Sequence, residues 1–195
     1  MKVIGLTGGI ATGKSEVTKI LRKMKIPVFD ADAAVHALYQ NGIAAQYLKN
    51  ICPEAIFGVK VDRSKLSGLI LEHPNLLKKI ESIVHPLVRD AEKDFLTEVA
   101  KSSAKVAVID SPLLIETDHY KDMDFSILIA ASRENQIKRA MMRPNMTKEK
   151  VKLLLAKQKS TAEKRKIVDL VIDNNATLGE LEDQVRSAFG KLMDA

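Results

Sequence analysis

Five short apolar runs divide the chain and alternate with segments of helical spacing. They cover residues 3–6, 27–29, 106–109, 126–130 and 170–172. Short, nearly continuous apolar runs are typical of strands that are buried on both faces. Because parallel strands need crossover connections, this alternation predicts an α/β fold of the three-layer type, with a five-stranded parallel sheet and helices on both faces.

Polar residues follow four of these runs directly. A glycine-rich segment follows the first, Asp30 and Asp32 follow the second, Asp110 follows the third, and Asp173 and Asn174 follow the fifth. Ligands of open parallel sheets bind at the carboxyl ends of the strands. The pattern therefore predicts a functional site at this edge of the sheet.

Two segments interrupt the alternation. Residues 33–103 contain no convincing strand and show helical spacing, for example at Val88, Phe95 and Val99 after an expected helix start at Pro86. Residues 143–166 are strongly basic and helical in spacing. We interpret the first as a helical insertion that receives an acceptor substrate and the second as a mobile lid. The core of a single domain would then comprise residues 1–32, 104–142 and 167–195.

Composition narrows the class of protein. The chain of 195 residues is 46% hydrophobic and 29% charged, as expected of one globular domain. No apolar stretch approaches the roughly 20 residues that span a bilayer, so no membrane partner is expected. The chain begins almost at once with strand residues, which leaves no room for a leader. With the single cysteine, Cys52, this indicates a cytoplasmic protein without an internal disulfide.

Residues 8–15 have the sequence GGIATGKS and fit the phosphate-loop pattern G-x-x-x-x-G-K-[ST]. They lie between an apolar run and a segment of helical spacing, which is the context that the motif requires. Glycines allow backbone amides to curl around phosphate oxygens. Lys14 can reach the outer phosphates, and the Ser15 hydroxyl can bind Mg²⁺. The motif predicts that the protein binds a nucleoside triphosphate.

Three carboxylates are candidates for the chemistry. Asp32 is our candidate for the general base that activates an attacking hydroxyl. Asp30 could share this work or bind metal through water, or one of the pair could cap a helix that starts near Ala33. Asp110 is a candidate for holding Mg²⁺, and the alternative is an acid in the turn before Ser111.

Three basic residues are candidates for phosphate contacts. Arg139 and Arg143 are four residues apart and are expected on one helix face, where guanidinium groups could neutralise phosphate. The alternative is a pair of solvated surface arginines. His85 precedes Pro86 and is expected in extended backbone before a helix. It could bind phosphate or act only as a neighbour of the helix start.

The set of motifs resembles the dephospho-coenzyme A kinase family nearly from end to end. The resemblance rests on TGG at 7–9, GKS at 13–15, DAD at 30–32, HP at 85–86, DSPLLIE at 110–116, QIKR at 136–139, Arg143 and IDN at 172–174. It implies a kinase that uses Mg²⁺ and transfers the γ-phosphate of ATP to the ribose 3′-hydroxyl of dephospho-coenzyme A. The products would be coenzyme A and ADP, in the final step of coenzyme A synthesis.

The resemblance also implies roles for individual residues. The catalytic residues would be Asp32, Lys14 and Arg139. The ATP contacts would come from Gly9, Ala11, Thr12, Gly13, Lys14, Ser15, Glu16, Arg143 and Asn174. The acceptor would be bound by Thr7, Asp32, His85 and Leu113, and the metal by Ser15 and Asp110. The chain departs from the family pattern at Ala11, Thr12 and Glu16, and Leu154 stands where the family's lid usually carries an arginine.

Two other functions fit parts of the pattern. A kinase of the same architecture could act on a nucleoside monophosphate or a sugar-like alcohol, although the long insertion favours a long acceptor. The net charge of +6 also suits an ATP-dependent nucleic-acid-binding protein. An aromatic content of 4% argues against nucleic acid as a partner, because aromatic side chains form the stacking platforms. The sequence favours no particular oligomeric state.

Overall fold

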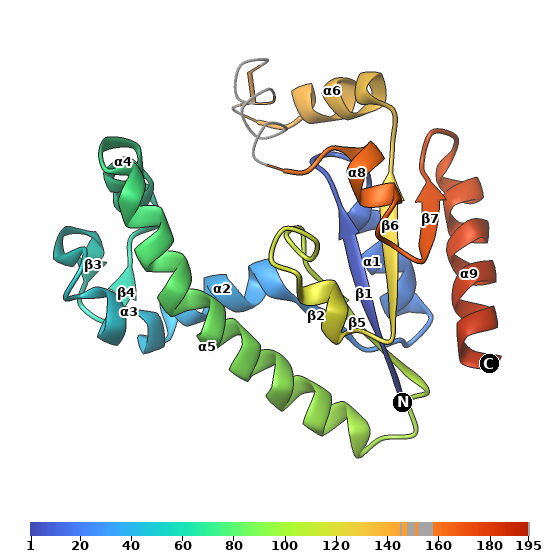
Figure 1. Ribbon diagram of the computed structural model, residues 1–195, viewed down its shortest axis with the longest axis horizontal. Coiled ribbons are helices and arrows are strands. Elements are labelled where there is room, and N and C mark those ends of the chain that lie inside the picture. The colour runs from blue at the N-terminus through green and yellow to red at the C-terminus, as the bar shows by residue number, and fades with distance from the viewer. Residues whose placement is uncertain (145, 148–150, 152–157, 195) are drawn as a thin grey trace. The chain divides into compact units, whose positions relative to one another are not determined.

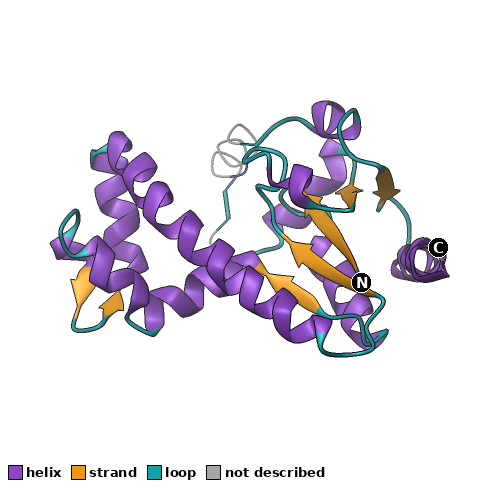
Figure 2. Cartoon of the chain, turned by 60° about the horizontal axis from the view of Figure 1, so that its bottom comes forward, coloured by secondary structure: helices purple, strands orange, loops and turns teal. Residues whose placement is uncertain are grey.

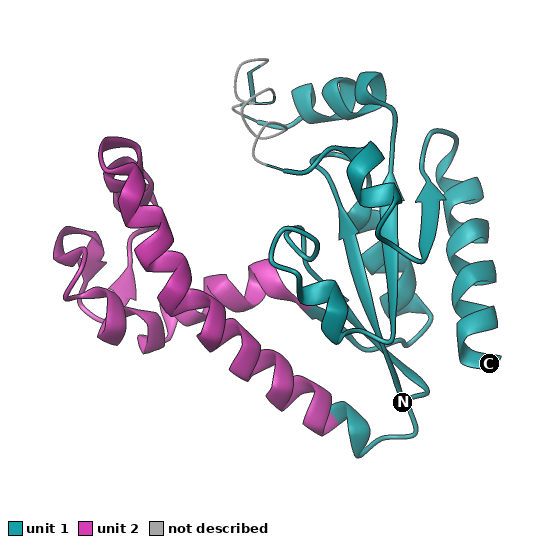
Figure 3. Cartoon of the chain, viewed as in Figure 1, with its two compact units in different colours: residues 1–29, 99–195 teal, residues 30–98 magenta. Residues whose placement is uncertain are grey.

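The chain forms two compact units in a computed structural model, which describes all residues except 145, 148–150, 152–157 and 195. Unit 1 comprises residues 1–29 and 99–195, and unit 2 comprises residues 30–98 (Figure 3). Each unit has its own buried apolar cluster. We therefore describe each unit by itself.

Unit 1 is built around a five-stranded sheet with the strand order β2-β5-β1-β6-β7 (Figure 1). Its strands are β1 (Lys2–Gly8), β2 (Val28–Asp30), β5 (Val106–Asp110), β6 (Phe125–Ala130) and β7 (Leu170–Asp173). Its helices are α1 (Lys14–Lys23), α6 (Arg133–Met141), α8 (Thr161–Arg165), α9 (Leu178–Asp194) and the 3-10 turn η2 (His119–Asp122). All five predicted strands are confirmed.

The central strand β1 runs parallel to β5 on one side and to β6 on the other. Its register places Leu6 opposite Asp110 of β5 and opposite Ile127 of β6. Helices α1 and α9 pack against one another on one face, where Leu21 and Phe189 join the strand residues in one buried cluster. Figure 2 shows α9, the helix at the C-terminus, nearly end-on. The predicted parallel sheet flanked by helices is thus confirmed.

The other face of β1 is covered closely by the segment after β5. A Cβ atom at Gly5 would lie 2.7 Å from a methyl group of Leu114 and 3.0 Å from Met123. This close approach requires glycine in the middle of the central strand. The buried side chains of Leu114 and Ile115 thereby fix the loop that follows Asp110 onto the sheet.

Unit 2 consists mainly of helices. They are α2 (Ala31–Gln40), α3 (Ile43–Leu48), α4 (Arg63–Glu72) and α5 (Pro74–Ala100), with the 3-10 turn η1 (Pro53–Ala55). Leu48, Leu66, Ile80 and Val84 belong to its buried apolar cluster, which draws on α3, α4 and α5. The helical spacing predicted for this part of the chain is confirmed.

Unit 2 also contains a small antiparallel hairpin, so the expectation of no strand between residues 33 and 103 is wrong. The strands β3 (Ile56–Phe57) and β4 (Lys60–Val61) pair across a turn in which Gly58 has a φ of 61°. A strand of two residues is too short to show alternation in the sequence. The glycine in the turn was the one available signal.

The helix start expected at Pro86 is also wrong, because α5 begins at Pro74 and contains Pro86 in its interior. Proline in a helix interior removes a hydrogen bond and costs about 3 kcal/mol. Packing offsets this cost, since Ile83 and Val84 before the proline and Leu87 and Val88 after it contact the same buried cluster. His85 therefore lies within a helix and is exposed, rather than in extended backbone.

Cys52 is buried in unit 2, and its thiol donates to the carbonyl of Leu48 at 3.5 Å. Burial raises the pKa of the Cys52 thiol, and the charge of Glu54 adds to this effect. The thiol is therefore protonated at neutral pH. In the described part of the chain, no helix is both long and apolar enough to cross a membrane.

Candidate functional site

The phosphate loop connects β1 to α1 and ends in a left-handed residue. Gly13 has a φ of 96° and is the N-cap of α1, and its carbonyl accepts from the amide of Glu16 at 2.9 Å. Ala11 has a φ of 56°, which is uncommon for a residue with a side chain. The first turn of α1 thus follows directly from the loop, and the positive end of the helix dipole favours an anion at this point.

Three side chains hold the carbonyl groups of the loop. Gln136 Nε2 donates to the carbonyl of Ile10 at 3.1 Å, and Asn174 Nδ2 donates to that of Thr12 at 2.8 Å. Thr12 Oγ1 donates to the carbonyl of Gly9 at 3.0 Å. Because these carbonyl oxygens are engaged by protein donors, the loop can present its amides to phosphate oxygens without opposing dipoles.

Replacing Gly13 by alanine should disrupt this arrangement. A Cβ atom there would lie 2.1 Å from Asn174 Nδ2, and a positive φ costs a residue other than glycine about 1–3 kcal/mol. We expect the melting temperature to fall and ATP to bind at least about tenfold more weakly, as when a positioned hydrogen bond is lost. Thermal unfolding and calorimetric titration with ATP measure both effects. Gly68→Ala in α4 is the matched control, because nothing lies within 4 Å of its Cβ position. ATP binding at wild-type strength in Gly13→Ala would contradict the prediction.

Lys14 and Asp110 form a largely buried ion pair beside the loop, with side chains that are 17% and 4% exposed. Asp110 ends β5 and is 4% exposed, and its second oxygen accepts from Thr18 Oγ1 at 2.9 Å. Lys14 and Thr18 are one helical turn apart on α1, so a single helix engages both carboxylate oxygens. Sequence reasoning missed Thr18. The available signal was a polar residue on the apolar face of α1, between Val17 and Leu21.

The candidate metal ligands are Ser15 and Asp110. Ser15 is exposed in the first turn of α1. Within the described residues, no group of three or more histidine, cysteine, aspartate or glutamate side chains could hold a metal ion. A hydroxyl and a carboxylate are hard oxygen donors that fit Mg²⁺, which commonly keeps several waters and binds substrate phosphates. The donor set therefore fits a metal that arrives with a nucleotide.

Arg139 and Arg143 do not lie on one helix face, so that expectation is wrong. Helix α6 ends at Met141, and Arg143 lies exposed beyond it, next to Pro144. The residue before a proline is disfavoured in helical backbone. Arg139 remains in the helix, and its Nη1 donates to the carbonyl of Asn174 at 3.0 Å. Arg139 thus holds Asn174, whose side chain in turn donates to the carbonyl of Thr12 in the phosphate loop.

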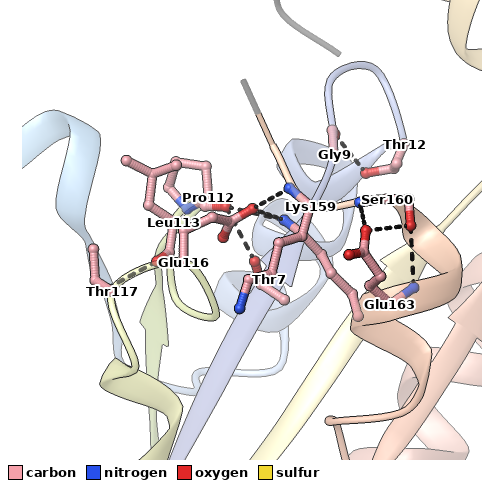
Figure 4. Close-up of polar contacts among 11 residues, drawn as sticks. Thr7, Gly9, Thr12, Pro112, Leu113, Glu116, Thr117, Lys159, Ser160 and Glu163 are labelled. Carbon is pink, nitrogen blue, oxygen red and sulfur yellow. Dashed lines mark hydrogen bonds and ion pairs between the residues drawn. The ribbon is translucent and has the colours of Figure 1, made fainter. Parts of the chain in front are cut away.

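Thr7, Leu113 and Glu16 are three further residues that the sequence predicts for the site. Thr7 is buried at the end of β1, and its hydroxyl donates to the carbonyl of Pro112 at 3.3 Å (Figure 4). Leu113 follows Pro112 and is partly exposed. Glu16 pairs with Lys19 at 2.8 Å on the exposed surface of α1. The carboxylate of Glu16 is thus already bound to a neighbouring cation.

The remaining predicted site residues belong to unit 2. Asp30 ends β2 and caps α2, where its carboxylate accepts from the amide of Ala33 at 2.9 Å. The capping alternative is therefore confirmed for Asp30, although the helix begins at Ala31 rather than near Ala33. Asp32 is exposed in the first turn of α2, and His85 is exposed on α5.

The predicted lid, residues 143–166, is described only in part. Residues 145, 148–150 and 152–157, which include Leu154, lie outside the described residues. Val151 is buried in an apolar cluster with Ala11 of the phosphate loop and Ala140 of α6. At the other end of the segment, Ser160 and Glu163 form a capping box that starts α8.

Known proteins share both the sequence pattern and the fold of this chain. A model of the dephospho-CoA kinase family matches residues 2–180. A dephospho-CoA kinase of Rhodopseudomonas palustris is 41% identical over 186 residues, which cover 95% of this chain and 93% of that protein. The crystal structure of TT1252 from Thermus thermophilus is 32% identical, with a TM-score of 0.83 over 98% of this chain and 97% of that chain. A dephospho-CoA kinase from Campylobacter jejuni shows the same fold at 22% identity, with a TM-score of 0.75 over 98% of this chain and 97% of that chain.

Proposed function

The chain belongs to the dephospho-CoA kinase family, and we propose that it transfers the γ-phosphoryl group of ATP to the ribose 3′-hydroxyl of dephospho-coenzyme A. The products are coenzyme A and ADP. The conformation of the phosphate loop carries the proposal: its carbonyl groups are held by Gln136, Asn174 and Thr12, and Lys14 lies beside it. This arrangement suits the phosphates of a nucleoside triphosphate, because backbone amides and a lysine meet in one place.

Lys14 and the loop amides stabilise the charge that develops during transfer. Phosphoryl transfer has a loose transition state, so the protein mainly supplies positioning and electrostatic stabilisation. Lys14 pairs with Asp110 in this structure and is thereby held next to the loop. When ATP binds, the ammonium group exchanges part of this contact for the outer phosphate oxygens.

Kinases that use ATP generally need a divalent metal, and we propose Mg²⁺ held by Ser15 and Asp110. The ion would neutralise charge on the phosphates. Thr18 keeps one oxygen of Asp110 oriented through its hydroxyl, which leaves the carboxylate in a defined position. Ser15 offers its hydroxyl from the first turn of α1.

We assign Asp32 as the general base that takes the proton of the attacking 3′-hydroxyl. It follows β2 by two residues, and β2 belongs to the same sheet as the phosphate-loop strand β1. Asp30 is engaged as the cap of α2, which leaves Asp32 as the better candidate of the two. Thr7, Leu113 and His85 are proposed to contact the acceptor, and Arg139 and Arg143 the phosphates.

A coupled assay of ADP release with Mg²⁺-ATP tests the proposed function. Dephospho-coenzyme A is compared with adenosine, AMP and shikimate as acceptors. We expect acceptor-dependent ADP release with dephospho-coenzyme A and little with the other three, and the product should be coenzyme A by mass. Faster ADP release with another alcohol would contradict the assignment of dephospho-coenzyme A as the acceptor. A complete lack of acceptor-dependent release would overturn kinase activity in this chain.

A further inference from the structure

A buried ion pair lies in unit 1 next to the candidate site. Lys164 Nζ is 2.9 Å from Glu116 Oε1, and the two side chains are 2% and 15% exposed. Glu116 lies in the loop after β5, whereas Lys164 lies in α8, so the pair joins segments that are 48 residues apart in the sequence. Neither residue is explained by the roles assigned above.

Both members of the pair also bind the backbone. Glu116 Oε1 accepts from the backbone amide of Lys159 at 3.0 Å, just before the capping box that starts α8 (Figure 4). Lys164 Nζ donates to the carbonyl of Pro112 at 3.4 Å. The same carbonyl accepts from Thr7 at the end of β1. The pair therefore connects three segments: the end of β1, the loop after β5 and the end of the basic segment 143–166.

Stability alone does not account for this pair. Burying two charges carries a desolvation cost, and replacing such a pair by apolar side chains is often neutral or stabilising. The second oxygen of Glu116 is shielded from solvent and has no hydrogen-bond partner among the described residues. The carboxylate of Glu116 thus gives up hydration, and in return it fixes the positions of the groups that it binds.

We propose that Glu116 and Lys164 are positioning residues for phosphoryl transfer, which rests on the function proposed above. Glu116 holds the amide of Lys159 and so fixes the end of the basic segment. Lys164 pairs with the carboxylate of Glu116. It also donates to the carbonyl of Pro112 and so holds the loop that carries Leu113. Because Thr7 and Leu113 are the proposed acceptor contacts in this unit, disruption should affect the acceptor more than ATP.

Kinetics of Glu116→Gln separate the two substrates. Glutamine keeps the size and an acceptor oxygen but removes the charge that pairs with Lys164. We expect kcat/KM for dephospho-coenzyme A to fall about 100-fold, as for a small displacement of positioned groups. The KM for ATP should change less than about threefold, because the loop contacts of Gln136 and Asn174 stay intact. An equal loss for both substrates would overturn the proposal.

The double variant Glu116→Leu with Lys164→Met distinguishes positioning from stability. Glu116→Gln leaves the charge of Lys164 buried without its carboxylate partner, which should lower the melting temperature. The double variant removes both charges together, so we expect its melting temperature to lie closer to the wild-type value. Activity should stay low, because leucine cannot accept from the amide of Lys159. Recovery of kcat/KM together with the melting temperature would show that the pair is only structural. Lys121→Met is the matched control, because Lys121 pairs with Asp118 on the exposed surface.

Hydrogen exchange at the amide of Lys159 gives a readout that does not depend on the substrate. In Glu116→Leu with Lys164→Met, this amide should exchange at least about tenfold faster, which corresponds to the loss of a hydrogen bond to a charged group. Unchanged exchange would overturn the proposal even if activity were low. If the wild-type enzyme used another alcohol, the proposed function would fail, whereas exchange and the kinetics with that alcohol would still decide the role of the pair.

Discussion

Replacing Lys14 by methionine should lower kcat/KM for ATP by about 10³-fold, which is the effect of removing one preorganised group that stabilises transition-state charge. Methionine keeps most of the side-chain length but removes the ammonium group. The loss should appear in kcat as well as in KM, because the charge is needed most in the transition state. Steady-state ADP release over a range of ATP concentrations measures both.

This variant needs a control for stability. Lys14→Met removes the cation that pairs with the buried Asp110, and breaking a buried pair costs about 3–5 kcal/mol. In the double variant Lys14→Met with Asp110→Asn, the charge of Asp110 is also removed, while the amide oxygen can still accept from Thr18. We expect the melting temperature to recover and the activity to stay low. Recovery of activity in the double variant would contradict the role of Lys14.

Replacing Asp32 by asparagine should lower kcat by about 10²–10⁴-fold, the usual contribution of a general base. Asparagine has nearly the same size as aspartate but does not take up the proton of the hydroxyl. Asp32 is exposed, so we expect little change in the melting temperature. ATP affinity should also be unchanged. The kcat with dephospho-coenzyme A, measured at saturating ATP, checks this prediction.

Asp30→Asn is the matched control for Asp32→Asn. Asp30 caps α2 through the amide of Ala33, and asparagine is an equally good cap. We therefore expect this variant to keep its stability and most of its activity. A similar loss of kcat in both variants would show that the two carboxylates share the work. A normal kcat in Asp32→Asn would exclude this residue as the base.

The parts of the fold that could be predicted are those with a strong local signal. The runs that became β5 and β6 are almost entirely apolar, with Ser126 as the polar exception in β6, because both faces of these strands are buried. The phosphate loop matches a motif whose backbone conformation is well defined. In contrast, β3 and β4 have two residues each, and helix α5 passes through Pro86 because tertiary packing outweighs the local preference of proline.

The site was predictable where a residue belongs to a motif, and less so where its role depends on a distant partner. Lys14 was identified from the phosphate-loop motif, and Asp110 from its place after the apolar run at residues 106–109. Thr18, Gln136 and Glu116 were missed as site residues, because their contacts join residues 92, 126 and 43 positions apart in the sequence. A single sequence contains no pattern that shows which residues so far apart along the chain will be in contact. The end of α6 before Pro144 was readable in principle from the restriction that proline places on its neighbour.

The alanine at position 11 has a consequence for how this protein can change during evolution. Ala11 adopts a φ of 56°, where glycine would be less strained, but its methyl group contributes to the buried cluster with Val151 and Ala140. A mutation to glycine would relieve the backbone and remove apolar contacts at the same time. We therefore expect substitutions at positions 11, 140 and 151 to be coupled, because a change at one of them alters the space left for the side chains at the other two.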